Sequence, residues 1–203
     1  MSGGKAGAAM ADGGERPEQV KVQYRRMRFD FERTGFSRYW HGGSPFKSFF
    51  WDALSTAFPP GEKFFIDSAR GVRDQIDDPE LLEEIAEFCR QEGHHTYHHR
   101  KFNQMVGEQG FDVARYERRF ARVLGRARRR LGPMGMLTVT MALEHFTAGF
   151  AHRYLSDPHL AEGADPNVRA LWAWHAAEEA EHKSPCFDIY QRLGGEHRLR
   201  VAV

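Results

Sequence analysis

Four glutamates and two histidines recur in this sequence in an order that could bind metal ions. A Glu is followed 30 residues later by a Glu-x-x-His motif, and the same order returns further along the chain with a gap of 35 residues. The two sets are Glu62, Glu92 and His95, and then Glu144, Glu179 and His182. No thiol-containing metal motif accompanies them, because the two cysteines do not form a CxxC pair.

The spacing within each motif suits one face of a helix, because positions i and i+3 lie side by side. A Glu-x-x-His pair can then give its imidazole to one ion and share its carboxylate with a second. Gaps of 30 and 35 residues are long enough to finish one helix, turn, and return to the same depth. This order of residues is the ligand set of di-iron and di-manganese carboxylate bundles.

The charges of the predicted ligands balance those of two divalent ions, since four carboxylates carry four negative charges. Four carboxylates converging in a core without cations would be very unfavourable. Oxygen and imidazole ligands without thiolate favour iron, with manganese as an alternative. We therefore predict two metal ions, iron in the first place and manganese or zinc as alternatives.

Two further histidines lie on the same helix faces as the motifs. His175 is four residues before Glu179, so it is predicted to be a third histidine ligand; the alternative is a hydrogen-bonded core histidine. His99 is one turn beyond His95 and could be either a ligand or a partner of a ligand. Both possibilities for His99 stay open at this point.

Each motif also has a structural interpretation. A single Glu-x-x-His pair is common on solvated helix surface, so the prediction depends on the repeat. Glu62 lies near a predicted helix start, where a carboxylate can simply complement the helix dipole. Glu144 lies in an apolar segment, which weakens any surface interpretation. Glu178 and Glu181 flank the last motif and could orient a ligand histidine, or could be solvated.

The segments that carry these residues are predicted to be helices, because apolar residues recur at i, i+3 and i+4. Segment 133–155 is apolar nearly all round, so it should be the most buried. The predicted bundle helices are residues 60–76, 79–106, 133–155 and 166–193, the last bent near Pro185. A connecting helix at 112–131, a short helix at 46–57 and an irregular arm at 20–45 complete the domain.

The predicted fold is therefore all-α, a ferritin-like four-helix bundle with an extra connecting helix and an irregular N-terminal arm. Residues 20–203 are predicted to form one domain, and residues 1–19 a disordered tail.

A net charge of +1 argues against nucleic acid as a partner, and the arginines at 126–130 are interpreted as a solvated helix face. No apolar run is long enough for stable membrane insertion. A cytoplasmic location is expected, and a homodimer stays open.

Four runs resemble the bacterial family called predicted metal-dependent hydrolases: FPPGEKFF (58–65), QEGHHTYHHRKFN (91–103), ALEHFTA (142–148) and WAWHAAEEAEHK (172–183). The resemblance covers residues 20–193 and implies a metal-dependent enzyme. By this resemblance, the implied metal ligands are Glu62, Glu92, His95, His99, Glu144, His175, Glu179 and His182. The run His-x-x-x-Glu-x-x-His that begins at His175 is also similar to di-iron arylamine N-oxygenases, in which the extra imidazole is a ligand.

Three functional hypotheses follow. The favoured one is an oxygen-activating di-iron oxidoreductase that takes an apolar or aromatic small molecule, dioxygen and an electron donor. The second is a hydrolase that uses a metal-activated water, since no GxSxG motif is present. The third is a metal-binding protein that is not an enzyme. The candidate residues for an apolar pocket are Phe64, Phe65, Phe146, Trp172 and Trp174.

Overall fold

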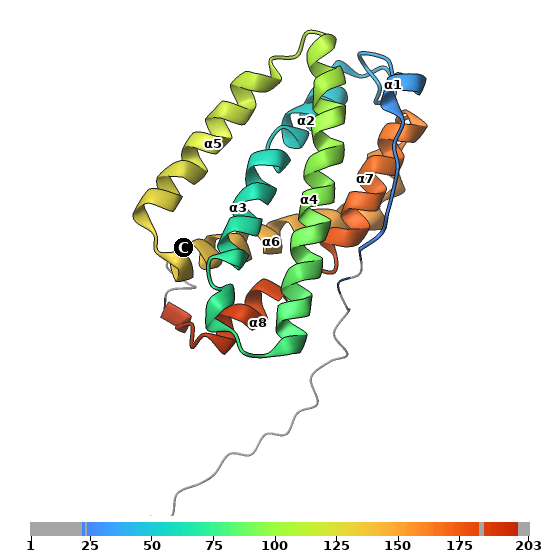
Figure 1. The fold of residues 1–203 in the computed structure, drawn as a ribbon. Helices are drawn as coiled ribbons and strands as arrows, with labels where there is room; N and C mark the ends of the chain where they lie inside the picture. The colour runs from blue at the N-terminus through green and yellow to red at the C-terminus, as the bar shows by residue number, and fades with distance from the viewer. Residues whose placement is uncertain (1–21, 23, 183–184, 199–203) are drawn as a thin grey trace, which may run out of the picture.

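The structure is a computed structural model, and it describes residues 22, 24–182 and 185–198 (Figure 1). Within these residues the chain is helical and contains no β-strand, only an isolated antiparallel bridge between His41 and Ala164. The all-α class is therefore confirmed. No helix among the described residues is both long and apolar enough to cross a bilayer. The predicted tail at residues 1–19 lies outside the described part of the chain.

The helices begin where the sequence supplies caps and prolines. Asp78 and Asp165 accept hydrogen bonds from first-turn amides, and Pro79 and Pro166 occupy the first turns, where a missing N–H costs nothing. The elements in chain order are α1 (Phe31–Thr34), α2 (Pro45–Ser55), α3 (Phe58–Arg70), η1 (Arg73–Gln75), α4 (Pro79–Glu108), α5 (Val113–Arg130), α6 (Pro133–Ser156), η2 (Pro158–Ala161), α7 (Pro166–Glu179) and α8 (Pro185–Arg192).

Two predicted helices are shorter in the structure than in the sequence analysis. The helix expected at 60–76 is α3, which ends at Arg70 and is followed by the turn η1. The helix expected at 166–193 is two helices, because α7 ends at Glu179 and α8 begins at Pro185. Proline lacks an amide donor and disfavours helical geometry in the residue before it. His182 therefore lies in a turn after α7 and not on a helix face.

The centre of the molecule lies among helices α3, α4, α6 and α7, which pack against one another (Figure 1). The most extensive packing joins α3 to α4 and α6 to α7, and the contacts of α3 with α6 bring the two pairs together. The predicted connecting helix is α5, which packs along the outside of α3 with Leu124 buried. The N-terminal arm runs beside α7 in Figure 1, as the contact of Phe29 with Trp174 also requires. The ferritin-like assignment of this bundle stays a prediction.

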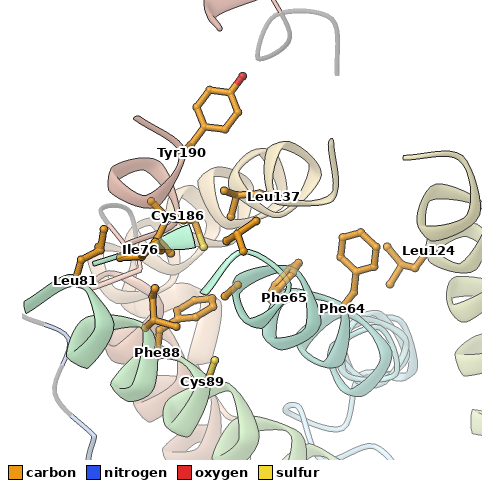
Figure 2. Close-up of a cluster of buried hydrophobic side chains, with 14 residues drawn as sticks. Phe64, Phe65, Ile76, Leu81, Phe88, Cys89, Leu124, Leu137, Cys186 and Tyr190 are labelled. Atoms are coloured by element: carbon orange, nitrogen blue, oxygen red, sulfur yellow. The ribbon is translucent and has the colours of Figure 1, made fainter. Parts of the chain in front are cut away.

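Two hydrophobic clusters enclose the layer that carries the predicted ligands. Figure 2 shows one of them, in which Phe65, Phe88 and Leu137 pack together at one end of the bundle. The other cluster contains Phe102 and Trp172. Along α4, Phe88 precedes the segment with Glu and His residues, and Phe102 follows it. The ligand layer therefore lies between two apolar layers, which exclude water from it.

A buried carboxylate in α2 makes stability depend on pH. Asp52 is fully buried and accepts a hydrogen bond from Trp40 Nε1 at 2.9 Å. Burial raises the pKa of Asp52 to about 6, although Trp40 and the nearby Arg38 guanidinium favour the charged form. Because the pKa is raised on folding, ionisation of Asp52 destabilises the folded state as pH rises from about 4 to above 6.

We therefore expect Asp52→Asn to increase the free energy of unfolding at pH 8 by about 2 kcal/mol, because the amide removes the buried charge and still accepts from Trp40. The gain should shrink toward pH 5, where the wild-type carboxyl is protonated in the folded state. Urea unfolding followed by circular dichroism at the two pH values measures the difference. A variant that is less stable than the wild type at pH 8 would contradict this assignment.

Candidate metal centre

The predicted ligands come from four helices and one turn, and all of them are buried. α3 supplies Glu62, α4 supplies Glu92 and His95, α6 supplies Glu144, α7 supplies His175 and Glu179, and the following turn supplies His182. None of these seven residues is more than 4% exposed. Chain segments far apart in the sequence therefore bring their polar groups into one dry layer.

Three overlapping sets of possible ligand atoms occur among the described residues. Within each set, the atoms lie within 4.8 Å of one another. The sets are Glu62 with His95 and His175, Glu92 with His95 and Glu179, and Glu92 with Glu144 and His182. Glu92 belongs to two sets, so it lies between two possible ion positions. An arrangement of this extent could hold two ions with shared carboxylates, as the sequence pattern predicted.

The distances between imidazoles and carboxylates show how closely the groups converge. His182 Nδ1 is 2.9 Å from a Glu92 oxygen and 3.3 Å from a Glu144 oxygen. His175 Nε2 is 3.0 Å from a Glu179 oxygen and 3.9 Å from a Glu62 oxygen. On one side of the cluster, His182 of the turn therefore lies beside Glu144 of α6. On the other side, His175 of α7 lies beside Glu62 of α3.

His95 and His182 are oriented by partners outside the ligand sets. His95 Nε2 donates to Glu178 at 3.0 Å, and His182 Nε2 donates to the amide oxygen of Gln91 at 2.9 Å. Each ring is therefore left with Nδ1 directed to the carboxylates, which is the arrangement that metal-binding histidines adopt when an outer partner fixes the tautomer. Of the two flanking glutamates, Glu178 contacts a ligand histidine directly.

Gln91 and Arg25 have roles that the sequence analysis missed. Gln91 Nε2 donates to Glu181 at 3.1 Å, so Glu181 acts on His182 through this amide. Arg25 donates its backbone N–H to Glu178 at 3.1 Å, and its guanidinium pairs with Glu181. The only signal for Gln91 is its position beside the Glu-x-x-His motif. Nothing in the sequence marks Arg25, which comes from the arm.

His175 is oriented by a chain of hydrogen bonds that runs through His99. Ser55 gives its one hydroxyl hydrogen to Asn103 Oδ1 at 2.6 Å, so it must accept from His99 Nδ1, at 2.7 Å. Burial lowers the pKa of His99 well below its usual value, so the ring is neutral. His99 Nε2 then accepts from His175 Nδ1 at 2.6 Å. The other ring nitrogen of His175, Nε2, faces Glu179 at 3.0 Å.

This geometry fits His99 as a partner of His175, because both of its nitrogens are engaged and none of the three sets contains it. We therefore expect His99→Gln to weaken metal binding by roughly 10- to 100-fold while two ions still bind at saturation. Titration against a competing chelator gives the affinity. His98→Gln, one residue earlier on α4, is the matched control. If His99 is itself a ligand, one ion should be lost at every metal concentration.

The cluster contains too little positive charge to balance its carboxylates, as the pKa values of its residues indicate. Burial, with Glu92 and Glu179 adding repulsion, raises the pKa values of Glu62 and Glu144 well above the usual range. Burial also acts on Glu179, but His182 and His175 outweigh it and lower the pKa of Glu179 to about 2. The carboxylates outweigh burial at His182 and raise its pKa well above the usual value.

Several ligand atoms have no hydrogen-bond partner among the described residues, although buried acceptors are nearly always paired in folded proteins. The atoms are Glu62 Oε1, both carboxylate oxygens of Glu92 and of Glu144, Glu179 Oε2, and Nδ1 of His95 and of His182. Leaving such atoms unpaired costs about 1–3 kcal/mol each. Carboxylate oxygens and imidazole nitrogens are ligands that divalent cations take, so the residues present fit a metal site.

Comparison with known proteins supports a metal-dependent role. A family model described as predicted metal-dependent hydrolase matches residues 23–203, a range that includes every ligand candidate. Neither the curated proteins nor the solved structures gave a match.

Proposed function

The chain belongs to the predicted metal-dependent hydrolase family, and from this premise we propose that its buried Glu and His cluster binds two divalent ions for catalysis. The observation that carries the proposal is the convergence of buried, unpaired carboxylate and imidazole atoms from separate helices. One ion would take Glu144, His182 and Glu92. The other would take groups from the sets that contain His95.

We favour iron, and oxidation of an apolar small molecule by dioxygen, as the reaction. Carboxylate and imidazole ligands suit iron, and an apolar cavity reaches His175 and Glu179. In a hydroxylation, the substrate C–H bond and dioxygen, with two electrons and two protons from an external donor, would give a C–OH group and water. Bound ferrous ions supply the electron transfer to dioxygen.

The chain's own residues have three tasks in this reaction. Glu178, Gln91 and His99 fix the ring orientations of the ligand histidines before any ion binds. The two hydrophobic clusters keep bulk water away from the ligand layer. The carboxylates give up their protons as positive charge enters, because their raised pKa values reflect burial without cations.

Hydrolysis by a metal-activated water is the second candidate, favoured by the family description and by a second cavity. This cavity of about 430 Å³ reaches Glu144 and His182, and its wall includes the polar side chains of Thr138 and His145. Water could approach one ion along it. A bound divalent ion would lower the pKa of that water and supply the nucleophile.

The first experiment measures metal content by mass spectrometry, followed by anaerobic loading with ferrous iron and an absorbance trace on addition of oxygen. About two irons per chain and a new near-ultraviolet or visible band that depends on oxygen would support the oxidase or oxygenase reaction. Two zinc or manganese ions with no response of the iron-loaded protein to oxygen would favour hydrolysis. Less than one ion per chain under every loading condition would refute the proposal.

A further inference from the structure

An apolar cavity of about 350 Å³ lies against the α7 side of the ligand cluster. Its walls come from α2, α3, α6 and α7, and its inner end reaches His175 and Glu179. At its outer end, Phe50 is 50% exposed and Phe146 is 73% exposed. The cavity is therefore a passage from the surface to two of the proposed ligands, with a volume at the lower end of the usual range for small-molecule sites.

The wall of this cavity offers almost no polar surface. Half of its lining residues are aromatic: Phe50, Phe58, Phe146, Phe150, Tyr154 and Trp172. No Lys or Arg lines it in the described part of the chain. The Tyr154 hydroxyl is directed to the backbone oxygen of Arg169, at 3.4 Å. The polar side chains of the lining are then His175 and Glu179, the hydroxyls of Thr147 and Tyr154, and the indole of Trp172, whose Nε1 has no hydrogen-bond partner among the described residues.

We propose that this cavity binds the substrate of the metal centre and that the substrate is an uncharged aromatic small molecule. The inference deepens the proposed function and rests on it, because the bound molecule is a substrate only if the metal centre is catalytic. An anion would lose its hydration without meeting a Lys or Arg in the wall, and the four carboxylates of the proposed centre already balance the charge of two divalent ions at the inner end, so its burial is strongly unfavourable. Aromatic walls favour a flat ring, because edge-to-face and offset contacts add to the energy of burial.

The inner end is shaped to place a ring against the ligands. The ring of Phe58 lies 4.4 Å from that of His175 and 4.6 Å from that of His99, measured between centroids. Phe58 is also 5.7 Å from Trp172. Phe58 is therefore held by these rings as an aromatic wall at the inner end of the cavity, where the lining reaches His175 and Glu179, so a bound molecule would lie next to the proposed ions.

The test uses two fluorescent probes with the same ring skeleton. N-phenyl-1-naphthylamine is uncharged, and 8-anilino-1-naphthalenesulfonate carries one added sulfonate. We expect the metal-free and metal-loaded proteins both to bind the uncharged probe at one site per chain. The sulfonate should bind at least about 10-fold more weakly, because burying an unpaired charge costs more than that factor requires.

Two pairs of variants place the binding site. Ala151→Leu fills the cavity, whereas Ala142→Leu, on the same helix α6, lines only the second cavity. Phe50→Asp puts a charge at the mouth, whereas Phe46→Asp changes a residue that is 79% exposed, one turn earlier on α2, and does not line the cavity. Ala151→Leu should weaken binding of the uncharged probe at least about 10-fold, because the larger side chain overpacks the cavity. Phe50→Asp should weaken it by a similar factor, because the bound probe would bury the new charge. The two controls should leave it unchanged.

Phe50→Asp keeps the test decisive if Ala151→Leu does not fold, because Phe50 is half exposed. Absence of saturable binding, equal binding of the two probes, or equal effects of a variant and its control would overturn the inference. Metal content measured on the same samples separates this failure from failure of the proposed function. Two bound ions without probe binding refute the cavity assignment alone, whereas probe binding without metal refutes the metal centre and with it the role of substrate.

Discussion

Replacement of Glu92 by Gln is expected to weaken metal binding at both ion positions, whereas the same replacement of Glu144 should weaken it at one. Glu92 belongs to two of the three sets of ligand atoms, and Glu144 belongs to one. Glutamine has the same shape but no negative charge, so each variant removes one unit of charge from the centre. The difference between the variants therefore reports whether a carboxylate is shared between two ion positions.

Metal content per folded chain, measured after dialysis against buffered manganese or anaerobic ferrous iron, tests this expectation. We expect about two ions in the wild type, about one in Glu144→Gln, and a lower metal content in Glu92→Gln than in Glu144→Gln at the same free metal concentration. Glu83→Gln, an exposed position on α4, is the matched control and should keep both ions. Circular dichroism should show unchanged helix content in all variants. Equal losses in Glu92→Gln and Glu144→Gln would contradict a shared role for Glu92.

The sequence predicted which side chains converge because its signal is periodic. A carboxylate and an imidazole at i and i+3 mark one face of a helix, and gaps of 30 and 35 residues return the chain to the same depth. The structure brings seven of the eight predicted residues into overlapping sets. The eighth, His99, lies next to them, with its ring nitrogens engaged by Ser55 and His175.

The residues that orient the ligands were harder to predict because their contacts are not periodic. Arg25 comes from an arm without a repeating pattern, and Ser55 lies near the end of a separate short helix. The end of α7 at Glu179 was also missed, since the pattern of apolar residues continues through Pro185. His182 still reaches Glu92 from the turn, so its predicted position in the cluster did not depend on the predicted helix.

Aromatic residues give the least information about position, because they serve a hydrophobic core and a binding pocket equally well. Of the predicted pocket residues, Phe146 and Trp172 line the apolar cavity beside the ligands. Phe64 and Phe65 belong instead to the core cluster of Figure 2. Trp174 packs against Phe29 of the arm, on the other side of α7 from the cavity lining. Only the tertiary structure separates these roles.

Removal of metal should lower the free energy of unfolding by about 3 kcal/mol or more, relative to protein held at a metal concentration on the order of 100 times the dissociation constant. The carboxylates and imidazoles converge without compensation when no cation is bound, and bound ions would pair with the atoms that lack partners. Urea unfolding with a chelator, and again with added manganese, measures the difference. Equal unfolding free energies in the two conditions would mean that the cluster does not bind metal in the folded state.

The size of this stabilisation should grow with pH. In the metal-free protein, burial raises the pKa values of Glu62, Glu92 and Glu144, and the neighbouring carboxylates raise that of His182 against the effect of burial. Raised pKa values mean that the folded state holds these protons more tightly than the unfolded chain, so metal-free stability falls as pH rises.

Metal ions replace the same protons, so loading should release protons and bind more tightly at higher pH. Glu179 does not oppose this trend, because its pKa of about 2 keeps it ionised. Burial lowers the pKa values of His95 and His99, so these rings oppose the trend only below about pH 7.5, where the unfolded chain still protonates them. Unfolding at about pH 7.5 and pH 9, with and without manganese, and proton release into a weakly buffered indicator solution measure both effects. Metal-free protein that becomes more stable over this interval, or loading without proton release, would contradict this account of the buried charges.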